Sequence, residues 1–230
     1  MQLECRNISY SYPGSEAPVF RNISFCWAEA GFHALFGPSG VGKSTFAGIL
    51  WGSISPASGE IISRGIDRVG YSYNLERLPG WSPVGKHISK ITPEGSAGIR
   101  EELIDIFGME KCLGLRFSQL SLGQKNRVNL IRYLLQDFPF LILDESLANV
   151  DEMRREKIIL HIKALFPETF FLYISHNIME VSRFCKDILV FQGMGKHSRT
   201  RHVKGRDMKK GENPDPKASE RIMLEIMNAV

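Results

Sequence analysis

Apolar and polar positions alternate along the first thirty residues of the chain. The alternation runs through residues 3–8, stops at the turn sequence Tyr12-Pro13-Gly14-Ser15, and resumes through residues 19–25. A period of two on both sides of a turn is typical of half-buried strands that pair with each other. The pattern therefore predicts an antiparallel pair of strands at the N-terminus.

From Ser118 onward the pattern changes to helix-length segments that alternate with short apolar runs. Such alternation is typical of a mostly parallel sheet covered by helices, so we predict an α/β fold for this half. The expected helices span 124–136, 151–165 and 177–185, and the expected strands span 140–143, 169–175 and 187–191. Two further short strands are expected at 58–62 and 67–73.

The segment between Ser82 and Phe117 differs from its surroundings because prolines and glycines interrupt short helical stretches. We interpret it, with the helix that follows, as a small helical insertion at about 82–136. A polar stretch rich in glycine and proline begins at residue 193, and the apolar spacing of 222–227 predicts a terminal helix. These changes predict one domain at 1–192 and a C-terminal tail at 193–230.

The most specific motif is a glycine-rich loop at 37–45, which fits the phosphate-binding pattern G-x-x-x-x-G-K-[ST]. It follows an apolar run that is expected to be a strand, and it leads into an apolar helical pattern, as the motif requires. Its glycines let the backbone N–H groups curl around phosphate, and the helix dipole adds positive charge. Lys43 is expected to reach the β- and γ-phosphates and Ser44 to bind Mg²⁺. The candidate nucleotide-binding residues here are Gly37, Pro38, Ser39, Gly40, Val41, Gly42, Lys43, Ser44 and Thr45.

A second nucleotide signature is the apolar strand at 140–143, which ends in the carboxylates Asp144 and Glu145. In a parallel sheet ligands bind at the carboxyl ends of the strands, so Asp144 is expected beside the phosphate loop, where it can hold the Mg²⁺ shell. Glu145 is the candidate to orient and deprotonate an attacking water. Two acids after a strand can also simply begin a loop, but the pairing with the phosphate loop favours the catalytic interpretation.

Composition and cysteine usage are those of an ordinary globular protein, with 43% hydrophobic and 23% charged residues in 230. The longest apolar runs are far shorter than a membrane helix, and the N-terminus has no signal-peptide pattern, so we expect a cytosolic location. The four cysteines, Cys5, Cys26, Cys112 and Cys185, have no metal or disulfide spacing. We expect all four to be small buried apolar residues.

The net charge of +4 is concentrated in one segment of the tail. Residues 195–211 contain seven Lys or Arg against one Asp, a local charge of +6, which leaves about −2 for the rest of the chain. The plain interpretation of this basic segment is a solvated stretch. The charge distribution does not indicate a basic body that grips nucleic acid.

Between the two nucleotide signatures lies Leu120-Ser121-Leu122-Gly123-Gln124. With the motifs above, it resembles the L-S-G-G-Q hallmark of ATP-binding cassette (ABC) ATPases, and the likeness extends over roughly residues 1–192. The spacing of Ser121 and Gln124 alone fits an ordinary helix capping box. The resemblance implies instead that Ser121, Gly123 and Gln124 dock on the γ-phosphate of an ATP held by a second subunit.

The resemblance also assigns roles to three single residues. Tyr12 is expected to stack on adenine, with Tyr10 as the fallback, and Asp151 to end the loop that touches the partner subunit. His176 follows the strand at 169–175 and resembles the switch histidine that contacts the γ-phosphate. A lone tyrosine or histidine is often structural, but its place beside the phosphate motifs favours the functional assignment.

Three positions depart from the family pattern. Asn74 stands where the family has a glutamine that reaches Mg²⁺ and water, and its side chain is one methylene shorter. Leu122 replaces the first glycine of the hallmark, and Ser146 replaces the usual proline after the catalytic acid. These changes suggest slow turnover, but all the chemistry-bearing residues are present, so we expect an active ATPase.

The resemblance implies a function in transport. Residues 75–81 and the basic tail are similar to ATPases of bacterial importers of the nitrate, sulfonate and taurine group. The expected partners are a second ATPase subunit in a homodimer, transmembrane permease subunits and a substrate-binding protein, at the cytoplasmic face of the cell membrane. Two alternatives stay open: a soluble mechanochemical ATPase acting on ribosomes or nucleic acid, and an exporter or lipid-extracting ATPase. A single cassette and a short insertion argue against nucleic acid as the partner.

Overall fold

Two β-sheets form the body of the protein in the computed structural model, which describes residues 1–15, 17–73, 80–193, 200–213 and 215–230. The smaller sheet has the strand order β2-β1-β4. Its strands are β1 (Gln2–Tyr10), β2 (Phe20–Trp27) and β4 (Ser58–Arg64). Both neighbours of β1 run antiparallel to it, and Ile8 faces Ile23 across the β1–β2 pair. The predicted N-terminal antiparallel pair is therefore confirmed.

The larger sheet has the strand order β5-β6-β7-β3-β8-β9. Its strands are β3 (Gly31–Phe36), β5 (Val69–Tyr73), β6 (Phe140–Asp144), β7 (Phe170–Ile174), β8 (Asp187–Phe191) and β9 (Thr200–Lys204). All pairings are parallel except the last, where β9 runs antiparallel to β8. Every residue of β7 and β8 is buried, as expected for parallel strands covered on both faces. This arrangement confirms the α/β fold class with a mostly parallel sheet.

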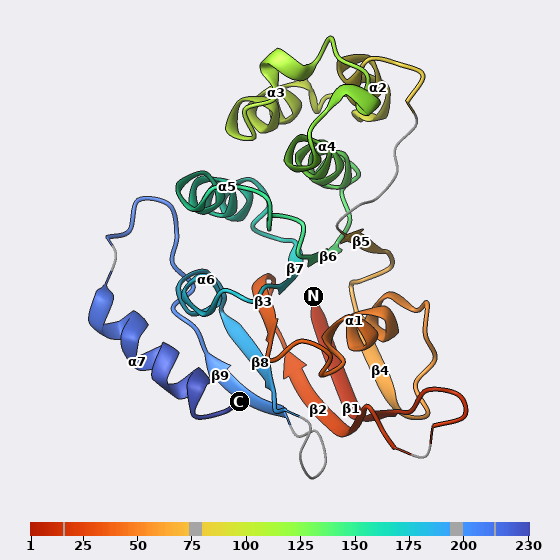
Figure 1. Ribbon diagram of the computed structural model, residues 1–230, viewed down its shortest axis with the longest axis vertical. Coiled ribbons are helices and arrows are strands. Elements are labelled where there is room, and N and C mark those ends of the chain that lie inside the picture. Colours follow the sequence, from red (N-terminus) through yellow and green to blue (C-terminus); the bar gives the residue numbers. More distant parts are fainter. Residues whose placement is uncertain (16, 74–79, 194–199, 214) are drawn as a thin grey trace.

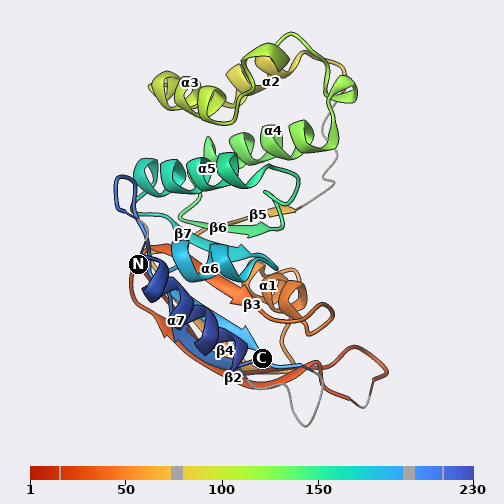
Figure 2. The same ribbon diagram turned by 60° about the vertical axis from the view of Figure 1, so that its left-hand side comes forward.

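The helices fall into three groups (Figures 1 and 2). The individual helices are α1 (Lys43–Trp51), α2 (Val84–Ile91), α3 (Ala97–Ile106), α4 (Leu122–Leu134), α5 (Glu152–Leu165), α6 (Ile178–Phe184) and α7 (Pro216–Met227), with 3₁₀ turns at Glu110–Cys112 and Phe117–Gln119. Helix α1 follows the phosphate loop, α2, α3 and α4 form a helical block at one end of the molecule, and α5, α6 and α7 lie beside the larger sheet. Helices α2, α3 and α4 lie together, away from the antiparallel sheet, and belong to the predicted helical insertion. In the part of the chain that the structure describes, no helix combines the length and hydropathy needed to cross a bilayer.

The core consists of two apolar clusters separated by the larger sheet. Neighbouring residues of β7 point to opposite faces, so Phe170 packs in the cluster shared with the smaller sheet and α1, whereas Phe171 packs in the cluster under the other helices. Both side chains are fully buried. The alternation anchors the central strands from both sides and fixes where their carboxyl ends emerge.

The structure corrects two expectations about the exterior. The basic segment of the tail is more than a solvated stretch, because residues 200–204 form β9 on the edge of the larger sheet, and Val203 and Met208 are buried in the core. The sequence analysis missed this strand because only one apolar residue lies within it. Cys26 is exposed rather than buried, since it points outward from β2, while the other three cysteines are buried as expected.

Candidate functional site

The phosphate loop connects β3 to α1, in the order strand, glycine loop and helix that the sequence predicts. Gly37, Gly40 and Gly42 all have positive φ, a conformation that favours glycine. At Gly37 a Cβ atom would lie 2.5 Å from the carbonyl oxygen of Phe191, so no side chain fits there. No side chain caps the start of α1, which leaves the first N–H groups of that helix for a ligand.

Lys43 is the first residue of α1, and its side chain folds back along the loop. Its Nζ donates to the carbonyl oxygens of Gly37 and Pro38, each at 2.8 Å. Burial lowers the pKa of this ammonium, and the nearby carboxylates of Glu145 and Asp144 oppose that shift. A buried cation is thus held at the loop by two carbonyls, with two acids close enough to favour its charge.

Asp144 ends β6 on the same edge of the sheet. The hydroxyl of Tyr71, on the neighbouring strand β5, donates to Asp144 Oδ2 at 2.6 Å. Burial, followed by this hydrogen bond, raises the pKa of the Tyr71 phenol, so the phenol keeps its proton and stays a donor. The bond fixes the direction of one carboxylate oxygen, and among the described residues the other oxygen has no hydrogen-bond partner.

Glu145 and His176 form a pair across the ends of β6 and β7. Oε1 of Glu145 lies 2.9 Å from Nε2 of His176, and the two side chains are 41% and 47% exposed. Glu145 has a φ of 51°, a left-handed conformation that costs energy for a residue with a side chain. This conformation turns the carboxylate out of the strand direction. It places a carboxylate and an imidazole together, open to a ligand.

These groups line one cavity of about 250 Å³ at the carboxyl ends of the strands. The lining residues are Ser39, Gly40, Gly42, Lys43, Ser44, Asp144, Glu145, Ile174 and His176. The structure therefore brings together the loop, the lysine, the serine, both acids and the histidine that the sequence singled out. A second hollow continues on the other side of the Glu145–His176 pair, bounded by Arg155 and Asn177 among others.

The hallmark residues lie elsewhere, at the start of α4 in the helical block. Ser121 caps α4: its Oγ accepts from Gln124 N at 3.3 Å, and Gln124 Oε1 accepts from Ser121 N at 2.8 Å. A Cβ on Gly123 would lie 2.7 Å from the carbonyl oxygen of Asn149, so glycine is required by this close approach. The same chain thus does not bring Ser121, Gly123 and Gln124 to its own Lys43 cavity.

The loop after Glu145 is fixed by local hydrogen bonds. Ser146 Oγ donates to the carbonyl oxygen of Ser72 at 2.8 Å and lies 3.1 Å from Ser72 Oγ, with all three atoms buried. Asp151 is the N-cap of α5, where its carboxylate accepts from Arg154 N at 2.9 Å. The serine that replaces the family's usual proline therefore ties the loop after Glu145 to strand β5.

Tyr12 lies beside the first turn of α1, the helix that follows the phosphate loop. Its hydroxyl is 2.7 Å from Thr45 Oγ1, and 51% of the residue is exposed. Tyr10, the fallback for adenine stacking, packs edge-on against Tyr12 with the ring centroids 5.3 Å apart. The candidate ligand Asn74 and most of the segment 75–81 lie outside the described residues.

Two contributors to the site were missed by the sequence analysis. Tyr71 and Ser72 both lie on β5, and neither belongs to a recognised motif. Parallel pairing of β5 with β6 brings Tyr73 opposite Asp144, so Tyr71, two residues earlier on the same face, can reach the carboxylate. A strand register deduced from the sequence could have found Tyr71, but not the bond from Ser146.

The residues present fit a magnesium nucleotide. Uncapped N–H groups at α1 and the Lys43 ammonium suit phosphate, while Ser44 and Asp144 supply the oxygen ligands that Mg²⁺ takes alongside phosphates and water. No cluster of three or more His, Cys, Asp or Glu that could hold a metal occurs in the part of the chain described. An ion at this site would thus depend on the phosphates for the rest of its ligands.

The fold and the site define the nucleotide-binding domain of a P-loop protein. The ABC transporter family model matches residues 20–148, more than half of the chain. The chain therefore belongs to the ABC transporter family, which confirms the resemblance seen in its motifs.

Curated relatives include importer subunits. The molybdenum import ATP-binding protein ModC of Brucella abortus (strain 2308) is 32% identical over 183 residues, which cover 71% of this chain and 51% of that protein. The ModC protein of Mesorhizobium japonicum is 34% identical over 179 residues, covering 68% of this chain and 48% of that protein. The chain thus spans about half the length of these relatives. Their names refer to molybdenum, not to nitrate, sulfonate or taurine.

Solved structures share the fold. A dimeric post-hydrolysis state of an ATP-binding cassette bound to ADP and Pi has a TM-score of 0.69 at 22% identity, covering 88% of this chain and 98% of that one. A bacterial Atm1-family ABC exporter with ATP bound has a TM-score of 0.75 at 18% identity, covering 99% of this chain and 41% of that one. At these identities the likeness concerns the fold alone and does not separate import from export.

Proposed function

We propose that this chain is the ATP-hydrolysing subunit of a bacterial ABC importer. The observation that carries the proposal is the convergence of Lys43, Ser44, Asp144, Glu145 and His176 on one cavity at the carboxyl edge of the sheet. These groups provide phosphate binding, metal ligation and a base in a single open site. Family membership supports ATP as the nucleotide.

The residues divide the work of hydrolysis. Lys43 and the N–H groups at the start of α1 bind and orient the phosphates, and Tyr12 offers an exposed ring for adenine. Glu145 accepts a proton from the attacking water, and His176 holds the Glu145 carboxylate and faces the γ-phosphate. Ser44 and Asp144 hold the metal, with Tyr71 fixing the Asp144 carboxylate. Magnesium, when bound with ATP, neutralises charge on the phosphates.

A second copy of the chain completes the site. The capped start of α4 with Ser121, Gly123 and Gln124 lies away from the Lys43 cavity of its own chain, as expected for an element that serves a partner. The first N–H groups of this helix suit the γ-phosphate held by the other copy. Asp151, at the start of α5, belongs to the loop that meets the partner.

The importer assignment concerns the surface of the helical block formed by α2, α3 and α4. The helical block would contact a separate permease, and the exposed Trp81 near its start supports that contact, since 80% of this large apolar side chain faces solvent. The names of the curated relatives support import over export. We place the subunit at the cytoplasmic face of the membrane, in a complex with a permease and a substrate-binding protein.

Replacing Glu145 by Gln tests the chemical proposal. Gln cannot take the proton from water, so phosphate release should fall at least about hundredfold while MgATP binding persists. Because ATP then stays bound, the variant should dimerise in MgATP. Calorimetry, phosphate release and light scattering on the purified chain measure these three properties.

Glu152→Gln is the matched control for this substitution. Glu152 is exposed on the first turn of α5, so its variant should hydrolyse ATP at the native rate. Undiminished phosphate release from Glu145→Gln would assign the base to another residue. A strictly monomeric Glu145→Gln protein at saturating MgATP would rule out a nucleotide site that a second copy of the chain completes.

Isolation of the membrane complex through a tag on this chain tests the importer assignment. A permease and a substrate-binding protein should co-purify, and solute loaded on the binding protein should stimulate ATP hydrolysis by the complex. Stimulation by molybdate would show that the complex transports the solute for which the relatives are named. Stimulation by nitrate, a sulfonate or taurine would show that it belongs to the importer group suggested by residues 75–81. Recovery of ribosomes or nucleic acid instead would contradict the importer assignment.

A further inference from the structure

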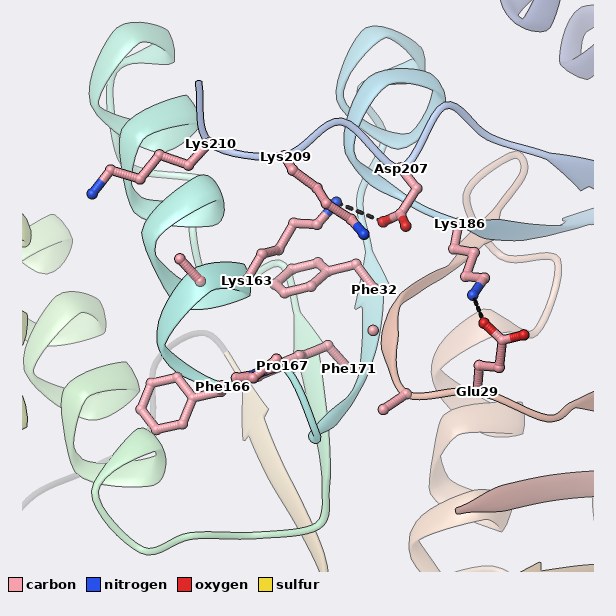
Figure 3. Close-up of a pocket in the computed structure, with 13 residues that line it drawn as sticks. Glu29, Phe32, Lys163, Phe166, Pro167, Phe171, Lys186, Asp207, Lys209 and Lys210 are labelled. Atoms are coloured by element: carbon pink, nitrogen blue, oxygen red, sulfur yellow. Dashed lines mark hydrogen bonds and ion pairs between the residues drawn. The ribbon is translucent and has the colours of Figure 1, made fainter. Parts of the chain in front are cut away.

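A further cavity, of about 410 Å³, is drawn in Figure 3. It lies at the opposite edge of the larger sheet from the nucleotide site, at the amino ends of the parallel strands. We refer to it as the far-edge cavity, and it is lined from the first residues of β3 and β7, the end of α5, Lys186 before β8 and the segment 207–210 after β9. The nucleotide residues follow the last residues of β3, β6 and β7. Since these strands are parallel, the two cavities are separated by the length of the sheet.

One wall of the far-edge cavity is held in place by hydrogen bonds. Asp207 N donates to the carbonyl oxygen of Cys185 at 3.1 Å, and Met208 N donates to that of Arg183 at 2.8 Å. The ammonium of Lys163 donates to Asp207 Oδ1 and to the carbonyl oxygens of Met208 and Phe184, at 2.7, 2.7 and 2.8 Å. Lys163 thereby uses all three of its protons on the protein, so the cavity is formed before any ligand binds.

The interior of the cavity is apolar on one side. Phe32 and Phe171 stack at its floor with ring centroids 4.6 Å apart, and Phe166 and Pro167, at the end of α5, form a wall (Figure 3). A volume of this size is in the range of small-molecule sites. Such a lining favours a ligand with a flat apolar body.

The rim of the cavity carries excess positive charge, with four lysines against the two carboxylates Glu29 and Asp207. Lys163 is saturated as described, Lys186 is paired with Glu29, and Lys210 Nζ lies 2.9 Å from His161 Nε2. Lys209 is different: within the described residues its ammonium has no hydrogen-bond or ion-pair partner. One cation at the rim is therefore available to a ligand.

We propose that the far-edge cavity binds a small aromatic anion, with the ring against Phe166 and Pro167 and the carboxylate, sulfonate or phosphate group on Lys209. The apolar wall supplies most of the burial, and Lys209 selects for negative charge. The site is independent of nucleotide binding and does not require the proposed ATPase activity. Ligand and nucleotide can occupy the same chain together.

Binding of 8-anilinonaphthalene-1-sulfonate, an aromatic sulfonate, tests the proposal on the full chain. Calorimetric titration should give one site per chain, with the same stoichiometry with and without saturating MgATP. Lys209→Ala should weaken binding about threefold to fivefold, the loss expected for one partly exposed charge contact. The matched control is Lys217→Ala on α7, which removes an exposed lysine outside this cavity and should leave the affinity unchanged.

Two further experiments test where the aromatic ring of the ligand binds and whether its negative charge contributes to binding. Ala164→Trp places a large side chain in the cavity from an exposed position on α5 and should abolish sulfonate binding without unfolding the chain, as circular dichroism will check. The neutral analogue N-phenyl-1-naphthylamine should bind equally to the native chain and to Lys209→Ala. Displacement of the sulfonate by MgATP, equal affinity of Lys209→Ala and Lys217→Ala, or unchanged binding to folded Ala164→Trp would each overturn the proposal.

Discussion

Two carboxylate–histidine pairs lie on the same sheet, and their surroundings differ sharply. At the carboxyl edge, Glu145 and His176 are 2.9 Å apart with 41% and 47% of their side chains exposed. Nearer the opposite edge, His33 of β3 and Asp187 of β8 face each other at 3.2 Å with only 1% and 6% exposed. The same two kinds of group are therefore open to a ligand in one place and enclosed in the other.

The enclosed pair makes most of its polar contacts within the protein, although His33 Nδ1, 3.2 Å from Asp187 Oδ2, completes no hydrogen bond among the described residues. His33 is stacked between Trp27 and Phe170, with ring centroids 4.5 and 5.1 Å away, and its Nε2 lies 3.0 Å from the carbonyl oxygen of Glu29. His202 and Lys204 of β9 also contact the Asp187 carboxylate. The contacts from His202 and Lys204 join β9 to Asp187 at the start of β8, so we expect this cluster to hold β9 on the sheet.

What these two pairs can do chemically depends on their unused bonding capacity more than on their residue types. Glu145 and His176 follow the carboxyl ends of β6 and β7 and line an open cavity, whereas Asp187 begins β8 with Oδ1 in contact with His202 and Lys204 and Oδ2 facing His33. The open pair is expected to control turnover, and the enclosed pair to control stability.

The largest expected effect comes from breaking the open pair. His176→Ala removes the imidazole that holds Glu145, so ATP hydrolysis should fall about hundredfold or more while the thermal midpoint stays within about 2 °C of the native value. Steady-state phosphate release and thermal unfolding of the same preparation measure both properties. The matched variant is His202→Ala from the enclosed cluster, which should hydrolyse ATP at the native rate at 25 °C. If His176→Ala lowered stability and left turnover intact, the division between open and enclosed pairs would be wrong.

The residues at the carboxyl ends of the strands could be picked out from the sequence because they carry recognisable spacings. The loop at 37–45 and the acids Asp144 and Glu145 each form a local pattern, and the alternation of helix and strand predicted the sheet that joins them. The hallmark Ser121–Gln124 is equally local, although it lies at the start of α4. Local patterns suffice there because each motif is continuous in the chain.

The enclosed cluster could not be predicted in the same way. His33, Asp187 and His202 are far apart in the sequence, and only the β3–β8–β9 pairing brings them together. Strand β9 itself has the sequence Thr-Arg-His-Val-Lys, whose charges indicate a solvated stretch until their partner Asp187 is known. Long-range pairing of buried polar groups leaves no periodic signal in a single sequence.

A smaller effect, on stability alone, should follow from breaking the enclosed pair. Burial would raise the pKa of the Asp187 carboxyl, but the contacts from His202, His33 and Lys204 outweigh burial and hold that pKa below its usual range. Asp187→Asn keeps the shape but removes the charge, and should lower the free energy of unfolding by about 2 kcal/mol at pH 7. Urea unfolding measures the loss, and ATP hydrolysis by the folded fraction should be unchanged.

The pH dependence of that loss identifies the charge as its cause. Because the pKa of Asp187 is lower in the folded chain, its stabilisation is complete above the unfolded pKa of about 4 and disappears as pH falls toward the folded value. The native chain and Asp187→Asn should therefore differ fully at pH 7 and progressively less below about pH 4. Asp105→Asn, at an exposed position on α3, should stay within about 0.5 kcal/mol of the native chain throughout. A constant difference between the native chain and Asp187→Asn from pH 7 to pH 3 would attribute the loss to packing, and the enclosed pair would then stabilise the sheet by shape rather than by charge.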